Sequence, residues 1–182
     1  MKKNFSSVIW ITGLSGSGKT TISKILKKKL ESIYERVIHL DGDELRECAS
    51  TIITQNSFSN SDRIRIGLFY SKLARKFASQ NFIVIMSVMA LQKEVHTWNK
   101  KNISSLFDVM LDVPIKELKS RDPKGIYKRY NEGKIKNLYG LDLQYDKPKK
   151  PWMNIKWSKQ LNKNLIAKRI INKLVKDKNF KK

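Results

Sequence analysis

Residues 13–20 read GLSGSGKT and have the residue types and spacing of a phosphate-binding loop, G-x-x-x-x-G-K-[ST]. Glycines at these points let the backbone curl so that its N–H groups face phosphate oxygens, and the following helix start adds positive potential. In this pattern Lys19 reaches the β- and γ-phosphates, and the Thr20 hydroxyl binds Mg²⁺. The motif predicts a nucleoside triphosphate site, although alone it leaves GTPase, ATPase and kinase open. The predicted ATP-binding residues of the loop are Gly13, Leu14, Ser15, Gly16, Ser17, Gly18, Lys19, Thr20 and Thr21.

A second group with chemical potential is the carboxylate pair Asp41 and Asp43, which follows the apolar run 36–40. Phosphoryl transfer requires a base near the attacking hydroxyl, and Mg²⁺ prefers oxygen ligands, often through water. Either carboxylate could serve as the base or hold the hydrated Mg²⁺, and either could instead cap the next helix. Arg46 and Arg63 are candidates for neutralising an anionic acceptor, or are ordinary surface arginines.

Alternating strand and helix patterns must position these groups. The apolar runs 8–12, 36–40, 82–86, 107–113 and 153–157 predict strands, and 18–33, 62–79, 92–101, 114–120 and 160–176 predict helices. This alternation predicts an α/β fold of three layers around a parallel sheet, with the carboxylate pair at the edge where strands end. Within the helices we expect two buried stripes: Ile66, Phe69, Leu73 and Phe77, and Leu165, Ile166, Ile170 and Leu174.

The basic stretch 121–151 has weak periodicity, and its length without a clear element predicts a functional lid rather than packing. We also expect the tail from Lys176 onwards to fray.

Composition narrows the class. The 182 residues suit a single domain over 1–182, and one cysteine, Cys48, fits a reducing cytosol, where we expect it to be partly buried. No run of about eighteen apolar residues indicates a membrane span. The net charge of +22 suggests nucleic acid as a partner, but dispersed lysines favour a solvated surface and polyanionic small substrates. We therefore predict a cytoplasmic enzyme of small nucleotides, without membrane or nucleic-acid partners.

Five motifs in order resemble the adenylylsulfate (APS) kinase family over about residues 8–151: GLSGSGKTT (13–21), LDGDELR (40–46), FSNSDR (58–63), RDPKGIY (121–127) and GKIKNLYGLDLQYDKPKKP (133–151). That family moves the ATP γ-phosphate to the ribose 3′-hydroxyl of a nucleotide with a mixed phosphate anhydride. The resemblance implies Mg²⁺, a homodimer, and Asp41 and Asp43 near that hydroxyl and Mg²⁺. It further implies that Arg121 and Lys124 cover ATP. The acceptor residues implied are Asp43, Arg46, Phe58, Arg63 and Lys136, together with positions Ile66, Leu138 and Tyr139.

Three positions depart from the family pattern. Ile66 stands where the family has an acceptor-binding Asn, Leu138 where a Phe stacks on adenine, and Ala90 where a serine is often described as a phospho-intermediate. Loss of a polar contact and of a base stack each costs about 1–3 kcal/mol, so adenylylsulfate binding should weaken about 100-fold. Tyr139 is an alternative aromatic face for a base.

The departures imply a different acceptor, and the known relative with this character is the cytidine diphosphoramidate kinase type, which acts in capsule phosphoramidate biosynthesis. Two alternatives stay open. One is an authentic APS kinase of sulfate assimilation, and the other is a nucleic-acid-binding ATPase that uses the basic surface.

Overall fold

The computed structural model describes residues 5–51 and 59–180. Five parallel strands form one sheet in the order β2-β3-β1-β4-β5. The strands are β1 (Ser7–Thr12), β2 (Val37–Asp41), β3 (Ile83–Val88), β4 (Leu106–Asp112) and β5 (Met153–Lys156). The helices are α1 (Lys19–Glu31), α2 (Gly42–Cys48), α3 (Asn60–Ala78), α4 (Lys93–Asn102), α5 (Ile115–Arg121), α6 (Ile126–Asn131) and α7 (Lys163–Leu174), with a 3₁₀ turn at Lys178–Phe180.

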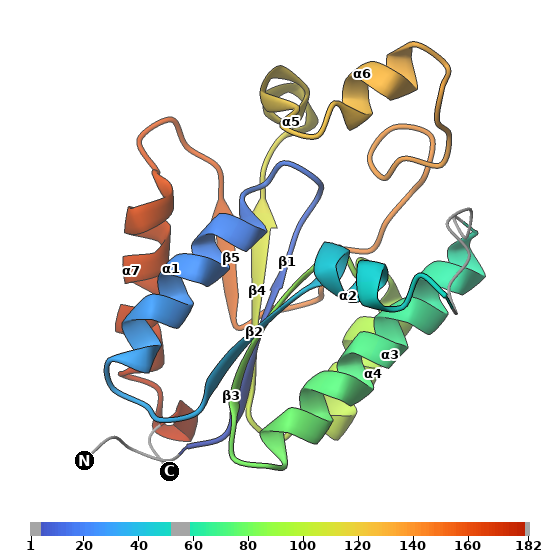
Figure 1. Cartoon of the computed structure of the whole chain (residues 1–182). Coiled ribbons are helices and arrows are strands. Elements are labelled where there is room, and N and C mark those ends of the chain that lie inside the picture. Colours follow the sequence, from blue (N-terminus) through green and yellow to red (C-terminus); the bar gives the residue numbers. More distant parts are fainter. Residues whose placement is uncertain (1–4, 52–58, 181–182) are drawn as a thin grey trace.

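Helices cover both faces of the sheet, which confirms the predicted three-layer α/β architecture (Figure 1). The central strand β1 is buried on both sides because its successive side chains point to opposite faces. Ile9 and Ile11 pack with α1 and α7, whereas Val8 and Trp10 pack with α3 and α4. All four are at most 1% exposed, so the strand that precedes the phosphate-binding loop is fixed from both sides.

Helices α3 and α7 begin at side-chain caps. Ser59 accepts a hydrogen bond from Asp62 N–H at 3.1 Å at the start of α3, and Asn162 does the same for Leu165 N–H at 2.9 Å at the start of α7. The α7 helix therefore starts three residues later than the sequence pattern suggested. Within the described residues, no helix is long and apolar enough to cross a membrane.

Several expectations about burial were wrong. Phe69 is 47% exposed and Leu165 is 36% exposed, whereas Ile66, Ile170 and Leu174 of the same predicted stripes are buried as expected. On α3 the buried stripe runs through Tyr70 and Ala74 instead of Phe69. Cys48 is exposed rather than partly buried. A helix pattern of period 3.6 allows adjacent stripes, and tertiary packing decides between them.

The C-terminal tail is packed as far as Phe180, the last residue described, rather than frayed from Lys176 onwards. Phe180 is 1% exposed, and its ring packs edge-on against those of Phe5 and Tyr34 and against Phe107 of β4. A buried aromatic ring contributes enough apolar area to hold a short segment in place.

The segment 121–151 packs more than expected. It contains α6, and Tyr127, Leu138 and Tyr139 are buried in a third apolar cluster with Leu14 of the phosphate-binding loop. The helices α5 and α6 lie beyond the end of the sheet where the strands finish, above the loop that follows β1 (Figure 1).

Candidate active site

The loop between β1 and α1 has the curled geometry that phosphate binding needs. A Cβ on Gly13 would lie 2.8 Å from the Leu111 carbonyl oxygen, and Gly18 has φ 93°, so a side chain is disfavoured at both points. Lys19, the first residue of α1, curls back over the loop. Its Nζ donates to the carbonyl oxygens of Gly13 at 2.8 Å and Leu14 at 3.0 Å.

The charge of Lys19 is weakened in this structure. Burial, followed by the nearby Lys124 ammonium, lowers the pKa of Lys19 to about 8, against the opposing effect of Asp43 and Asp41. Three or four negative charges of a bound triphosphate would raise that pKa again. Lys19 is therefore a group whose protonation is coupled to the arrival of phosphate.

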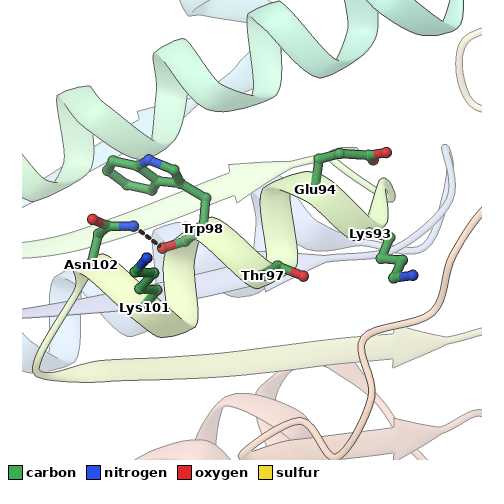
Figure 2. A pocket seen from close by; sticks show the side chains of 6 residues that line it. All are labelled: Lys93, Glu94, Thr97, Trp98, Lys101 and Asn102. Atoms are coloured by element: carbon green, nitrogen blue, oxygen red, sulfur yellow. Dashed lines mark hydrogen bonds between the residues drawn. The ribbon is translucent and has the colours of Figure 1, made fainter.

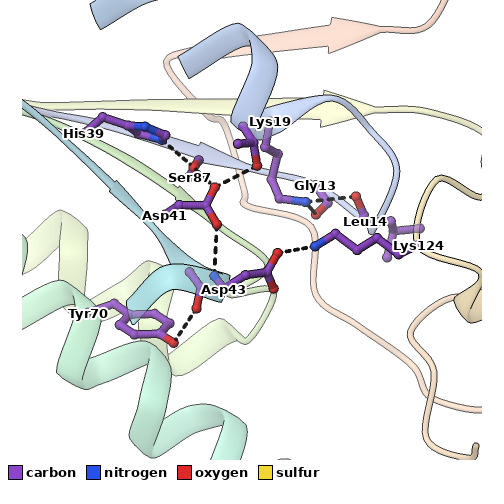
Figure 3. A network of polar contacts seen from close by, with 11 residues as sticks. Gly13, Leu14, Lys19, His39, Asp41, Asp43, Tyr70, Ser87 and Lys124 are labelled. Atoms are coloured by element: carbon purple, nitrogen blue, oxygen red, sulfur yellow. Dashed lines mark hydrogen bonds and ion pairs between the residues drawn. The ribbon is translucent and has the colours of Figure 1, made fainter. Parts of the chain in front are cut away.

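Asp41 is the centre of a hydrogen-bonded cluster at the end of β2 (Figure 3). Its Oδ2 accepts from the Thr20 hydroxyl at 2.7 Å and from the Ser87 hydroxyl at 2.7 Å, while its Oδ1 accepts from Asp43 N–H at 2.9 Å. The last bond makes Asp41 the cap of α2. Burial raises the pKa of Asp41, but the Ser87, Thr20 and Asp43 hydrogen bonds outweigh it and the net pKa is lowered. Asp41 thus accepts three hydrogen bonds, and its lowered pKa makes it a weak base.

Asp43 lies in a more open environment than Asp41. Its carboxylate is exposed and pairs with the Lys124 ammonium, which comes from the 121–151 segment. The turn that carries it is held from below, because the Tyr70 hydroxyl of α3 donates to the Gly42 carbonyl oxygen at 3.0 Å. Of the two carboxylates, Asp43 is the one open to a proton from a substrate hydroxyl (Figure 3).

His39 lies two residues before Asp41 on the same face of β2 and contacts the Ser87 hydroxyl through Nε2 at 2.8 Å. Burial lowers the pKa of His39, with the neighbouring Asp41 carboxylate opposing. The sequence pattern gave no sign of this contact, because it joins residues on different strands.

On the α3 side, Arg63 contacts the 136–140 loop. Its Nη2 donates to the Asn137 carbonyl oxygen at 2.8 Å, and its guanidinium carbon lies 4.6 Å from the centre of the Tyr139 ring. Tyr139 is 1% exposed and its hydroxyl accepts from Gln92 Nε2 at 2.6 Å. The ring face that we considered as a base platform is therefore covered by Arg63. Burial is the main cause that lowers the pKa of Arg63, and the nearby Arg46 guanidinium lowers it further.

The other residues expected to bind the acceptor differ in how exposed they are. Ile66 is 7% exposed within the apolar cluster of the α3 face, and Leu138 is 8% exposed in the third cluster. Lys136 is exposed, and Phe58 lies outside the described residues. Arg121, expected over ATP, pairs with Glu117 one turn earlier on α5 at 2.7 Å.

A further link joins the 121–151 segment to the phosphate-binding loop. Buried Tyr127 donates its hydroxyl to the Ser15 carbonyl oxygen at 3.1 Å, and α6 is held by Asp122, whose carboxylate accepts from Tyr127 N–H at 3.2 Å. The RDPKGIY motif contains both residues, but only the fold shows that its tyrosine reaches the loop.

A separate surface hollow of about 450 Å³ lies along α4 (Figure 2). Its lining residues are Lys93, Glu94, Thr97, Trp98, Lys101 and Asn102. All belong to one helix, so this hollow is distinct from the phosphate-binding loop and the Asp41 cluster.

Comparison with known proteins gives a consistent picture. The family model "Adenylylsulphate kinase" matches residues 5–156. Cytidine diphosphoramidate kinase of Campylobacter jejuni is 36% identical over 146 residues, covering 80% of this chain and 84% of that protein. Adenylyl-sulfate kinase of Clostridium acetobutylicum is 35% identical over 167 residues, covering 91% and 82%. The APS kinase of Mycobacterium tuberculosis, solved with AMPPNP and APS, superimposes with a TM-score of 0.84 at 27% identity, covering 95% and 99%.

Proposed function

The chain belongs to the adenylylsulphate kinase family and is a phosphotransferase acting on a nucleotide hydroxyl, and we propose that its acceptor is cytidine diphosphoramidate. The product would be the 3′-phosphorylated nucleotide, made from the ATP γ-phosphate. The reaction would belong to capsule phosphoramidate biosynthesis. A homodimer in the cytoplasm remains a prediction.

The observation that carries this proposal is the aliphatic character of positions 66 and 138. Ile66 and Leu138 offer no side-chain hydrogen bond and no aromatic face to an adenine, and both are nearly buried. The 36% identity to a cytidine diphosphoramidate kinase supports the same direction. A pyrimidine has less stacking area than adenine, so it loses less when a phenylalanine is replaced by leucine.

We assign the two carboxylates different roles. Asp43 takes the proton of the attacking 3′-hydroxyl, because its carboxylate is exposed and is held by the Lys124 ammonium rather than by a set of hydrogen-bond donors like those on Asp41. Asp41 already accepts three hydrogen bonds and is a poor proton acceptor. Lys124 then exchanges Asp43 for phosphate when ATP binds, and Arg46 and Arg63 neutralise the acceptor's phosphates.

The donor half also fits Mg²⁺. The Thr20 hydroxyl donates its hydrogen bond to Asp41, so the lone pairs of the Thr20 oxygen are available to a hard cation. Thr20, with Asp41 through water, would hold Mg²⁺ together with the ATP phosphates. When bound, Mg²⁺ supplies charge neutralisation of the transferred phosphoryl group.

The phosphoryl group passes directly between the two nucleotides in this proposal. Ala90, 3% exposed, stands where the family has a serine and has no hydroxyl to phosphorylate. Lys19 then stabilises charge on the transferred group, with no covalent enzyme intermediate.

An ADP-release assay with two rival acceptors tests the proposal. With ATP and Mg²⁺ constant, cytidine diphosphoramidate should give a kcat/KM at least about tenfold above that of adenylylsulfate. Authentic APS kinase activity is the second candidate, because the second relative and the solved neighbour carry that name. Efficient turnover of adenylylsulfate at micromolar KM would establish that candidate and reject ours.

A further inference from the structure

The number of protons available in the Asp41 cluster fixes the direction of its hydrogen bonds. A carboxylate can only accept, so the single hydroxyl proton of Ser87 is donated to Asp41 Oδ2. The Ser87 oxygen can then only accept from His39. Nε2 of His39 must therefore carry a hydrogen, and the bonds run from His39 to Ser87 to Asp41.

This arrangement follows from the register of two neighbouring strands. Asp41 pairs with Ser87 and His39 pairs with Ile85 along β2 and β3, so His39 and Asp41 lie on one face with Ser87 between them (Figure 3). The charged groups that act on His39 from the elements packed around it are Lys24 and Lys27 of α1, Glu44 of α2, and Asp41 of its own strand. His39 is thus a half-buried imidazole that reaches the Asp41 carboxylate through the Ser87 hydroxyl.

From this geometry we propose that His39 is a positioning residue for phosphoryl transfer. It holds the Ser87 hydroxyl in the rotamer that donates to Asp41, and Asp41 in turn holds the Thr20 hydroxyl. Without His39, the Ser87 hydroxyl can rotate, and Asp41 loses a donor that fixes its plane. His39 does not touch the reacting atoms; it acts through two intervening side chains. The proposal rests on the role given above to Asp41 and Thr20.

A purely structural role predicts something different. If His39 only filled space on β2, an apolar side chain of similar length would serve equally well, as Val37 does on the same face. Such a change would then alter stability without altering the chemical step.

The test compares His39→Met, which removes the donor, with His39→Gln, whose Nε2 can still donate to Ser87. We expect His39→Met to lower kcat about fivefold, the typical effect of one lost hydrogen bond, with the acceptor KM unchanged within about twofold. His39→Gln should recover at least half of the wild-type kcat. In a Ser87→Ala background, His39→Met should have no further effect on kcat.

Two measurements do not depend on turnover. Mn²⁺ binding in the presence of a non-hydrolysable ATP analogue, followed by electron paramagnetic resonance, should weaken several-fold in His39→Met and recover in His39→Gln. Nitrogen-15 correlation spectra of the ligand-free protein should show His39 as the Nε2–H tautomer. The chain has two histidines, so the imidazole signals that disappear in His39→Met are those of His39.

The proposal is overturned if His39 is the Nδ1–H tautomer, if His39→Met keeps wild-type kcat and Mn²⁺ affinity, or if the Gln and Met variants lose activity equally. Circular dichroism of both variants controls for folding, and the tautomer is read in wild-type protein regardless. If the wild type uses adenylylsulfate in place of cytidine diphosphoramidate, the proposed acceptor fails, but the same His39 comparison is made with adenylylsulfate.

Discussion

The depressed pKa of Lys19 predicts that nucleotide binding takes up a proton. In the ligand-free protein Lys19 has a pKa of about 8, so at pH 8 roughly half of the molecules carry a neutral amine. Bound β- and γ-phosphates favour the ammonium and return the pKa towards its ordinary value near 10.5. Binding at pH 8 should therefore absorb about 0.5 proton per site, falling to about 0.1 at pH 7.

The sign of the pH dependence follows from this linkage. The free protein binds fewer protons than the complex between the two pKa values, so nucleotide affinity falls as pH rises above 8. The loss approaches tenfold per pH unit by about pH 9 to 10. At pH 6 the amine is protonated in both states, and proton uptake by Lys19 disappears.

Isothermal titration calorimetry with a non-hydrolysable ATP analogue measures this directly. Titrations at pH 8 in buffers of different ionisation enthalpy give the number of protons absorbed. Lys19→Met should bind more weakly and lose the uptake. Lys19→Arg serves as the matched control, because it keeps a cation that stays charged at this pH. No uptake by the wild type at pH 8, or unchanged uptake in Lys19→Met, would refute the assignment.

Three further predictions concern other parts of the molecule. Ile66→Asn together with Leu138→Phe should shift the kcat/KM ratio towards adenylylsulfate by about 100-fold, at some cost in melting temperature because both positions are nearly buried; an unchanged ratio contradicts the acceptor proposal. Thr20→Val should lower kcat at least about tenfold and raise the Mg²⁺ requirement, while Thr20→Ser keeps the hydroxyl and most activity; equal activity of the two removes Thr20 from the metal site. Phe180→Ala should reduce the free energy of unfolding by about 3–5 kcal/mol in urea titrations, because the ring is 1% exposed among aromatic partners; a loss below 1 kcal/mol would mean that the tail adds little to the core.

The fold and the phosphate-binding loop were predictable because their signals are local. A buried strand, a glycine-rich turn and an amphipathic helix occupy consecutive residues from 7 to 31, and the same alternation recurs along the chain. The positions of Asp41 and Asp43 at the end of β2 followed from the same rule. Their different environments did not, because Ser87 and Lys124 reach them from 46 and 81 residues away.

Residues that depend on tertiary packing were the ones misjudged. Phe69 and Phe180 are both aromatic, yet the first is exposed and the second is buried. The residues next to each in the sequence do not predict this difference. Tyr127 and Tyr139 belong to the segment that we predicted to form a lid rather than to pack, yet both are buried. Amphipathic periodicity identifies a helix, but its orientation depends on which partner surface it meets.

The central place of β1 bears on how such an enzyme can diversify. The phosphate-binding loop follows β1, which has a neighbouring strand on each edge and helices on both faces. Most substitutions in β1 therefore disturb the core. Position 138 belongs instead to a connecting loop and position 66 to α3, and although both are nearly buried, neither lies on the strand that precedes the phosphate-binding loop. Mutations can therefore accumulate around the acceptor site while the phosphate-binding loop that holds ATP is preserved. Selection could then recruit a new nucleotide substrate onto an unchanged phosphate-transfer centre.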